Sequence, residues 1–214
     1  MKTIAIMLIK THNERLPGKN TKLLGDKPLL QYELLNLQKV NGIDKVIVYC
    51  SDDSICKDLP SGIVFEKRPE FLDLPSSNFT QIFENFIKIY DADIYVYAHA
   101  TAPFITVETM QECFDAVKSG EYDSAFCATK IQDFLWQDNL PLNFDATNVP
   151  RSQDIKPIYR ETSGVYVFTK EVFLSQKRRI GKKPYIKEVT YKEAVDINEP
   201  KDFKLAEVML SVDL

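Results

Sequence analysis

The residue types best suited to bind an anionic ligand lie in one short stretch near the start of the chain. Three cations, Lys10, Arg15 and Lys19, fall within ten residues, and Asn20 follows directly. Arginine offers a planar fork of donors and lysine a compact point charge, so together they could hold a polyphosphate. The stretch has neither the P-loop nor the dinucleotide-binding glycine pattern. A solvated loop that is basic by chance explains the spacing equally well.

A second candidate site lies near the C-terminus, where a single residue separates Asp196 from Asn198. At the end of a strand, residues two apart point to the same face. Such an acid–amide pair could hold Mg²⁺ against substrate phosphates, because Mg²⁺ takes few protein oxygens and keeps water. The competing interpretation is a helix cap, since Asn198 and Glu199 precede Pro200. On the residues alone, the cap is favoured.

Two further groups of polar residues could recognise a small ligand. His99 follows an apolar segment and would therefore lie at the carboxyl end of a strand, although a lone histidine there is more often a packing residue. Farther along, Arg151, Gln153 and Tyr159 supply side chains that suit a ligand bearing carboxylate and hydroxyl groups. Surface loops often contain the same residue types, so this second group is weak evidence by itself.

The elements that must position these residues alternate between strand-like and helix-like segments. Short apolar runs, typical of strands buried on both faces, occupy residues 4–9, 45–50, 62–66, 93–98 and 124–128. Apolar residues at helical spacing occupy 28–39, 79–90, 106–118 and 200–210. The alternation predicts an α/β fold, a Rossmann-like and mostly parallel sheet with helices on both faces. Ligands of such sheets bind beyond the carboxyl ends of the strands.

Residues 130–187 interrupt this alternation. They include the only tryptophan, Trp136, together with four prolines and many asparagine and aspartate residues. Strand-like pieces remain at 164–168 and 185–189, and the alternation returns at 193–197 as a last strand. We therefore expect a single domain over residues 1–214, with 130–187 as an inserted excursion.

Composition limits the class of protein. The chain has 27 basic and 31 acidic side chains, a net charge of −4, so a surface for nucleic acid is not expected. Four scattered cysteines without a C-x-x-C pair favour a reducing compartment over the alternative of a disulfide. No apolar run approaches the ~18 residues of a membrane span. We expect a cytoplasmic protein that binds neither nucleic acid nor membranes.

Taken in order, these pieces resemble the CMP-sialic acid synthetase family, the cytidylyltransferases that activate acylneuraminate and related acidic sugars. The family's opening pattern, Ala-Arg-x-Gly-Ser-Lys-Arg-x-Pro-x-Lys-Asn, is matched by residues 9–20. Shorter family patterns are matched by residues 51–53, 68–69, 99–103, 151–164 and 195–202. The resemblance covers nearly the whole chain and implies a sheet of the nucleotide-diphospho-sugar transferase type.

The sequence departs from the family pattern at four places. His12-Asn13-Glu14 replaces Gly-Ser-Lys, which puts a negative charge at Glu14 where the family has a cation. Lys10 stands for arginine, His99 for a glutamine that contacts the sugar, and Asn198 for an aspartate, although a carboxamide oxygen can still bind Mg²⁺. Two alternatives stay open: a nucleotidyltransferase for a different sugar, and a nucleotide-sugar-binding protein of the same fold with weakened catalysis.

The resemblance implies that CTP and an acidic 2-keto-3-deoxy sugar, sialic acid or a relative, give the CMP-sugar and pyrophosphate. It implies catalytic roles for Lys19 and Asp196, with Mg²⁺ held by Asp196 and Asn198. It also implies a homodimer, in which the excursion reaches the partner's site. Substrate contacts are implied for Lys10, Arg15, Asn20, Arg68, His99, Thr101, Arg151, Gln153 and Tyr159.

Overall fold

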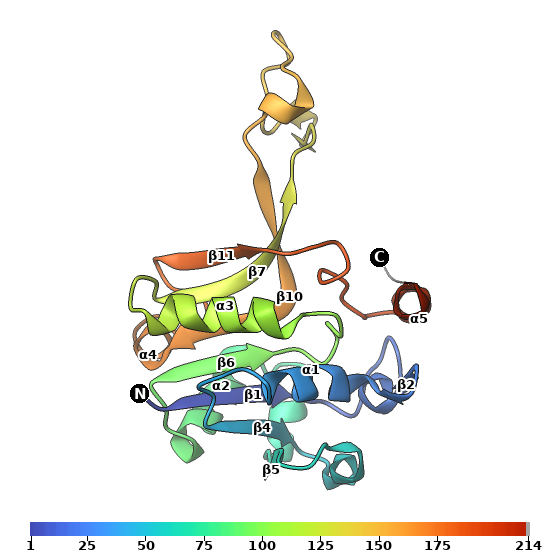
Figure 1. The fold of residues 1–214 in the computed structure, drawn as a ribbon, viewed down its shortest axis with the longest axis vertical. Helices are drawn as coiled ribbons and strands as arrows, with labels where there is room; N and C mark the ends of the chain where they lie inside the picture. Colours follow the sequence, from blue (N-terminus) through green and yellow to red (C-terminus); the bar gives the residue numbers. More distant parts are fainter. Residues whose placement is uncertain (213–214) are drawn as a thin grey trace.

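Seven strands form one sheet at the centre of the computed structural model, which describes residues 1–212 (Figure 1). Their spatial order is β11-β7-β10-β6-β1-β4-β5. Among these strands β10 runs antiparallel to both of its neighbours, and the other pairs are parallel. The predicted mostly parallel sheet is confirmed. The strands are β1 (Thr3–Leu8), β4 (Lys45–Cys50), β5 (Val64–Lys67), β6 (Ile94–Ala98), β7 (Ser124–Ile131), β10 (Ile158–Thr169) and β11 (Pro184–Glu188).

Helices cover both faces of the sheet, as predicted (Figure 1). Side chains of α1 and α3 pack in one core, and those of α2 and α4 pack in the core on the opposite face. Because successive side chains of a strand point to opposite faces, the neighbours Ala5 and Ile6 of β1 belong to different cores. The helices are α1 (Leu29–Leu37), α2 (Phe79–Ile89), α3 (Val107–Lys118), α4 (Lys170–Gln176) and α5 (Pro200–Ser211).

The ends of the helices have local causes in the sequence. Asn78 and Gln81 form a reciprocal capping box at the start of α2. The hydroxyl of Thr106 accepts a hydrogen bond from the N–H of Thr109 and so begins α3. The predicted helices therefore agree with the observed ones to within a few residues.

The predicted excursion at 130–187 is shorter in the structure. The outer ends of β7 and β10 pair beyond the sheet and enclose residues 132–157, which we call the arm and which project from the body (Figure 1). The arm contains a small hairpin of β8 (Trp136–Gln137) and β9 (Leu140–Pro141). Residues 158–169 and 184–188 are instead strands of the main sheet. The strand-like pieces predicted at 164–168 and 185–189 thus correspond to parts of β10 and β11, and only the outer part of β10, with polar residues at 160–162, was not recognised.

The predicted strand at 193–197 is wrong. The N–H of Ala194 donates to the carbonyl of Thr190, which closes a turn, and no strand forms there. The N–H of Ile197 donates to the carbonyl of Thr101 at 2.8 Å, and the Ile197 side chain packs in a small core with α5. The alternating apolar residues of 193–197 are therefore those of a partly buried loop and not of a strand.

The cap that competed with the magnesium site is present. The carboxylate of Asp202 accepts the N–H groups of Asn198 and Glu199, and Glu199 caps the start of α5. These contacts use the backbone of Asn198 and leave its side chain for other partners. The cap and the ligand site are thus compatible.

The cysteines and the helices bear on two expectations from composition, that of free thiols and that of no membrane span. All four cysteines are free thiols, so the disulfide alternative is not found. None of the helices within residues 1–212 is both long enough and apolar enough to span a bilayer.

Candidate active site

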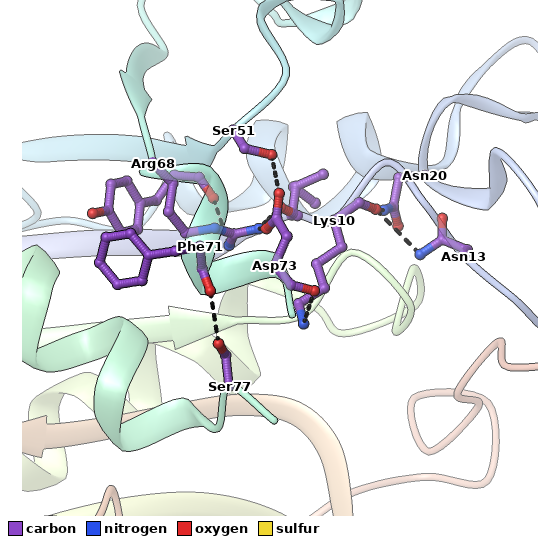
Figure 2. Close-up of polar contacts among 10 residues, drawn as sticks. Lys10, Asn13, Asn20, Ser51, Arg68, Phe71, Asp73 and Ser77 are labelled. Atoms are coloured by element: carbon purple, nitrogen blue, oxygen red, sulfur yellow. Dashed lines mark hydrogen bonds and ion pairs between the residues drawn. The ribbon is translucent and has the colours of Figure 1, made fainter. Parts of the chain in front are cut away.

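The predicted cationic loop follows β1 and folds back on its own beginning. The carbonyl of Lys10 accepts hydrogen bonds from the side-chain amides of Asn20 at 2.9 Å and Asn13 at 3.2 Å (Figure 2). Asn20 is buried, so one of its roles is to fix the shape of the loop. Gly18 adopts φ 65°, a left-handed conformation that favours glycine, just before Lys19.

A basic cleft of about 510 Å³ opens between this loop and residues 73–75. The ammonium group of Lys10 reaches across to the carbonyl of Asp73 at 3.3 Å (Figure 2). The three predicted cations Lys10, Arg15 and Lys19 all line the cleft, which therefore offers the charge that a polyphosphate needs. Glu14 lines the same cleft and is exposed.

The loop meets the C-terminal acid–amide pair. The Lys19 ammonium donates to the carbonyl of Ile197 at 3.0 Å, and Arg15 donates to the Asn198 side-chain oxygen at 2.8 Å. Burial lowers the pKa of Lys19, while the negative charge of Asp196 acts in the opposite direction. The two candidate sites of the sequence therefore form one site.

One carboxylate oxygen of Asp196 is buried without a hydrogen-bond partner among the described residues. Its Oδ2 accepts from the Asn198 amide at 2.7 Å, whereas its buried Oδ1 has no hydrogen-bond partner among residues 1–212. A buried polar atom without a partner is unusual and calls for an explanation. Within the described part of the chain, no three His, Cys, Asp or Glu residues cluster as a complete metal site. One carboxylate still fits Mg²⁺, which binds one or two carboxylates together with phosphates and water.

Arg68 connects three segments of the chain at the base of the site. Its side chain is 1% exposed and donates to the carbonyls of Ile9, at 2.7 Å, and Tyr49, at 3.2 Å. It also pairs with the Asp73 carboxylate, which accepts from the Ser51 hydroxyl (Figure 2). Arg68 thus joins the ends of β1 and β4 to the segment at the edge of the cleft, and its predicted substrate contact stays a prediction.

A second, inner cavity of about 260 Å³ adjoins the cleft and shares Lys10, Asn13 and Lys19 with it. His99 and Thr101 line this cavity, in agreement with their predicted place at the end of β6. Burial, followed by the charge of Arg179, lowers the pKa of His99 to about 4. The imidazole is therefore neutral at pH 7.

The predicted sugar contacts from the excursion lie outside both cavities. Arg151 and Gln153 are exposed residues of the arm, and Arg151 pairs with Asp154 at 2.7 Å. Tyr159 is exposed in the outer part of β10, at the base of the arm. The arm projects away from the body of the protein (Figure 1), and neither cavity that Lys19 lines includes any of these three residues.

Several residues of this region belong to no motif of the sequence. Asp73 holds both Lys10 and Arg68, yet it belongs to no recognised pattern. Phe79 and Tyr97 form the aromatic wall of the inner cavity, with ring centroids 5.2 Å apart. Tyr97 lies on β6, two residues before His99, so the two side chains point to the same face of the sheet. This alternation is the one feature of the sequence that could have identified Tyr97.

Curated relatives share sequence with most of the chain. The N-acylneuraminate cytidylyltransferase A of Danio rerio is 26% identical over 213 residues, which cover 95% of this chain and 49% of the relative. The pseudaminic acid cytidylyltransferase of Campylobacter jejuni is 23% identical over 195 residues, 82% of each protein. The chain thus spans about half the length of the first of these relatives.

Solved structures share the fold. The structure described as CMP:2-keto-3-deoxy-manno-octonic acid synthetase complexed with CTP has a TM-score of 0.72 at 14% identity, with 99% of both chains covered. The family profile described as Cytidylyltransferase matches residues 4–209, nearly the whole chain. The resemblance found in the sequence is confirmed, and the chain belongs to the cytidylyltransferase family.

Proposed function

We propose that the chain transfers CMP from CTP to the anomeric hydroxyl of an acidic 2-keto-3-deoxy sugar, sialic acid or a relative, and releases pyrophosphate. The observation that carries this proposal is the contact of Lys19 with the carbonyl of Ile197, beside Asp196. This contact puts cations for a triphosphate and a free carboxylate oxygen at one point. The named relatives activate acidic sugars, which supports the substrate class.

The cations of the loop would position and neutralise the triphosphate. Lys10 and Arg15 line the cleft, and Arg15 could exchange its bond to Asn198 for a bond to a phosphate. Lys19 lines both cavities, so it would lie nearest the α-phosphorus, where the sugar hydroxyl attacks in line. Positioning and charge stabilisation would supply most of the rate enhancement, because fixed charges aimed at the transition state need no reorganisation.

We also propose Mg²⁺ as the cofactor. Asp196 would hold it through Oδ1, and Asn198 would join through Oδ1 once Arg15 turns to a phosphate. When bound, the ion would neutralise phosphate charge and increase the acidity of the attacking hydroxyl.

The inner cavity would hold the acceptor, and a second subunit would complete it. His99 and Thr101 offer polar groups beside Lys19. The arm exposes Trp136, Leu140 and Val149, which are at least 59% accessible, and such apolar exposure favours a protein partner. We propose a homodimer in which Arg151, Gln153 and Tyr159 reach the partner's site.

The experiment is a screen for pyrophosphate release with MgCl₂. CTP, UTP and ATP are each combined with N-acetylneuraminic acid, pseudaminic acid or 3-deoxy-manno-octulosonate. We expect release with CTP and with one acid above the others. Release that is independent of any acid, or that prefers ATP or UTP, would contradict the proposal.

Glu14 favours the second candidate, a nucleotide-sugar-binding protein with weakened catalysis. Its carboxylate lines the cleft where phosphates would bind and would repel them. Calorimetric titration with CTP and MgCl₂ separates the candidates. Absence of CTP binding supports the second candidate, CTP binding without turnover of any of the three acids points to a different sugar, and turnover rejects the second candidate.

A further inference from the structure

Arg179 lies beside the aromatic wall of the inner cavity, although no motif singled it out. It belongs to the segment of residues 177–183 between α4 and β11. Its guanidinium carbon lies 3.8 Å from the ring centroid of Tyr166, 5.5 Å from that of Phe79 and 5.8 Å from that of Tyr97. Phe79 and Tyr97 line the inner cavity. A positive charge therefore lies against this wall.

His99 connects this charge to the reaction centre. Its ring centroid lies 4.4 Å from that of Tyr97 and 5.7 Å from that of Tyr166, so His99 and Arg179 share both tyrosine neighbours. His99 and Lys19 line the same cavity, and Arg179 lies against the Phe79 and Tyr97 rings of its wall. A ligand that extends from Lys19 along His99 would thus approach Arg179.

Two residues that line the cavity each have a buried polar atom without a partner. His99 Nε2 and Arg68 Nε are both buried and make no hydrogen bond to any residue within 1–212. Both residues line the inner cavity. Buried polar atoms are nearly always hydrogen-bonded, so these two point to a polar ligand at this place.

Arg179 has donors left for such a ligand. Its two hydrogen bonds to described residues, to Tyr166 Oη at 3.1 Å and Glu161 Oε1 at 3.4 Å, both use Nη2. The guanidinium has five N–H donors in a planar fork, which matches a carboxylate. The Arg179 and Glu161 side chains are 28% and 43% exposed, so their ion pair is weak and exchangeable.

Resting on the proposed function, we propose that Arg179 binds the carboxylate of the acceptor sugar and sets the preference for acidic over neutral sugars. The sugar would lie along the wall with its reacting hydroxyl near Lys19, its body beside His99 and its carboxylate at Arg179. The competing role is structural: Arg179 would only fix residues 177–183 to β10 through Tyr166 and Glu161.

The test compares Arg179→Met with the matched control Arg178→Met. Methionine can still pack on Tyr166 but has no charge. Arg178 is an exposed neighbour that bonds Gln176 and Gly181. Two acceptor substrates are used. The first is the acid that the wild-type protein turns over fastest among N-acetylneuraminic acid, pseudaminic acid and 3-deoxy-manno-octulosonate, and the second is the methyl ester of that acid. Circular dichroism and thermal melting verify that each variant is folded.

For Arg179→Met we expect the KM for the acid to rise on the order of 10- to 100-fold, because the variant loses a hydrogen bond to a charged group. The KM values for CTP and the ester should change less than about twofold, so the preference for the acid collapses. Arg179→Lys should recover part of that preference, and Arg178→Met should keep all of it.

Three results would overturn the inference. Arg179→Met could keep the wild-type KM for the acid, or its KM for acid and ester could rise together, as a structural role requires. Either result leaves the proposed function standing, because the wild-type protein still turns over the acid. If the wild-type protein turns over no acid at all, the proposed function fails and the inference fails with it.

Discussion

The ammonium group of Lys19 donates a hydrogen bond of 3.0 Å to the carbonyl oxygen of Ile197, which lies 178 residues farther along the chain. The bond joins the loop after β1 to the segment before α5. It also brings a cation next to the free carboxylate oxygen of Asp196. The bond therefore holds together the two segments that carry the candidate phosphate and metal ligands.

Lys19→Ala should reduce turnover on the order of 100- to 1000-fold, the usual cost of removing one preorganised donor to a developing charge. The side chain is half-buried at the cleft, so we expect the fold to survive. Pyrophosphate release measures the rate, and circular dichroism verifies the fold. Lys39→Ala, an exposed lysine that lines neither cavity, is the control. An unchanged rate in Lys19→Ala would remove Lys19 from the mechanism.

Asp196→Asn should weaken binding of the metal and leave the fold intact. We expect the MgCl₂ concentration for half-maximal rate to rise by about tenfold or more, since a charged ligand is replaced by a neutral one. A MgCl₂ titration at saturating CTP measures it. The wild-type protein should lose activity in excess EDTA. Full activity in EDTA, or the same MgCl₂ dependence in both proteins, would defeat the metal assignment.

Glu14→Lys should strengthen CTP binding. The exposed carboxylate lines the cleft with three cations, and reversing its charge replaces repulsion of the phosphates by attraction. Because exposed charges interact weakly, we expect the KM for CTP to fall only about two- to fivefold, and less at high salt. Glu121→Lys makes the same charge change away from the cleft and should leave the KM unchanged. A KM that rises in Glu14→Lys would show that Glu14 binds rather than repels.

The sequence predicted the part of the site that depends on the ends of parallel strands. Residues 10–20 and 99–101 follow β1 and β6, and these strands pair directly in the sheet. Because the carboxyl ends of parallel strands share one edge, both groups had to lie together. Apolar runs and caps were sufficient to place β1, β4, β5, β6 and β7 and the helices α1, α2, α3 and α5, but not α4.

What the sequence could not show depends on tertiary contacts. β10 enters the sheet antiparallel between β6 and β7, and no local pattern indicates that order. Arg68 has the residue type of a ligand contact, but its donors serve carbonyls of β4 and of Ile9. Arg179 stands in the basic run 177–183, which resembles an ordinary solvated segment until the fold stacks it on Tyr166.

Glu33 lies apart from both cavities and should make stability depend on pH. It is 0% exposed on α1, and neither of its carboxylate oxygens has a partner among the described residues. Burial raises its pKa well above the ordinary value. The folded protein therefore keeps this proton at a pH where the unfolded chain has released it. This contribution to stability is complete below the unfolded pKa and is lost as the pH rises toward the folded pKa.

Glu33→Gln removes this linkage. Its stability relative to the wild-type protein should increase between pH 5 and 7, by about 1.4 kcal/mol per pH unit while the pH stays below the folded pKa. Urea unfolding at several pH values measures the difference, and the exposed Glu207→Gln is the control. Parallel stability curves for Glu33→Gln and wild type would mean that Glu33 ionises normally. In that case a structural change around α1 must hydrate its carboxylate, because a buried charge without a partner is too costly to persist.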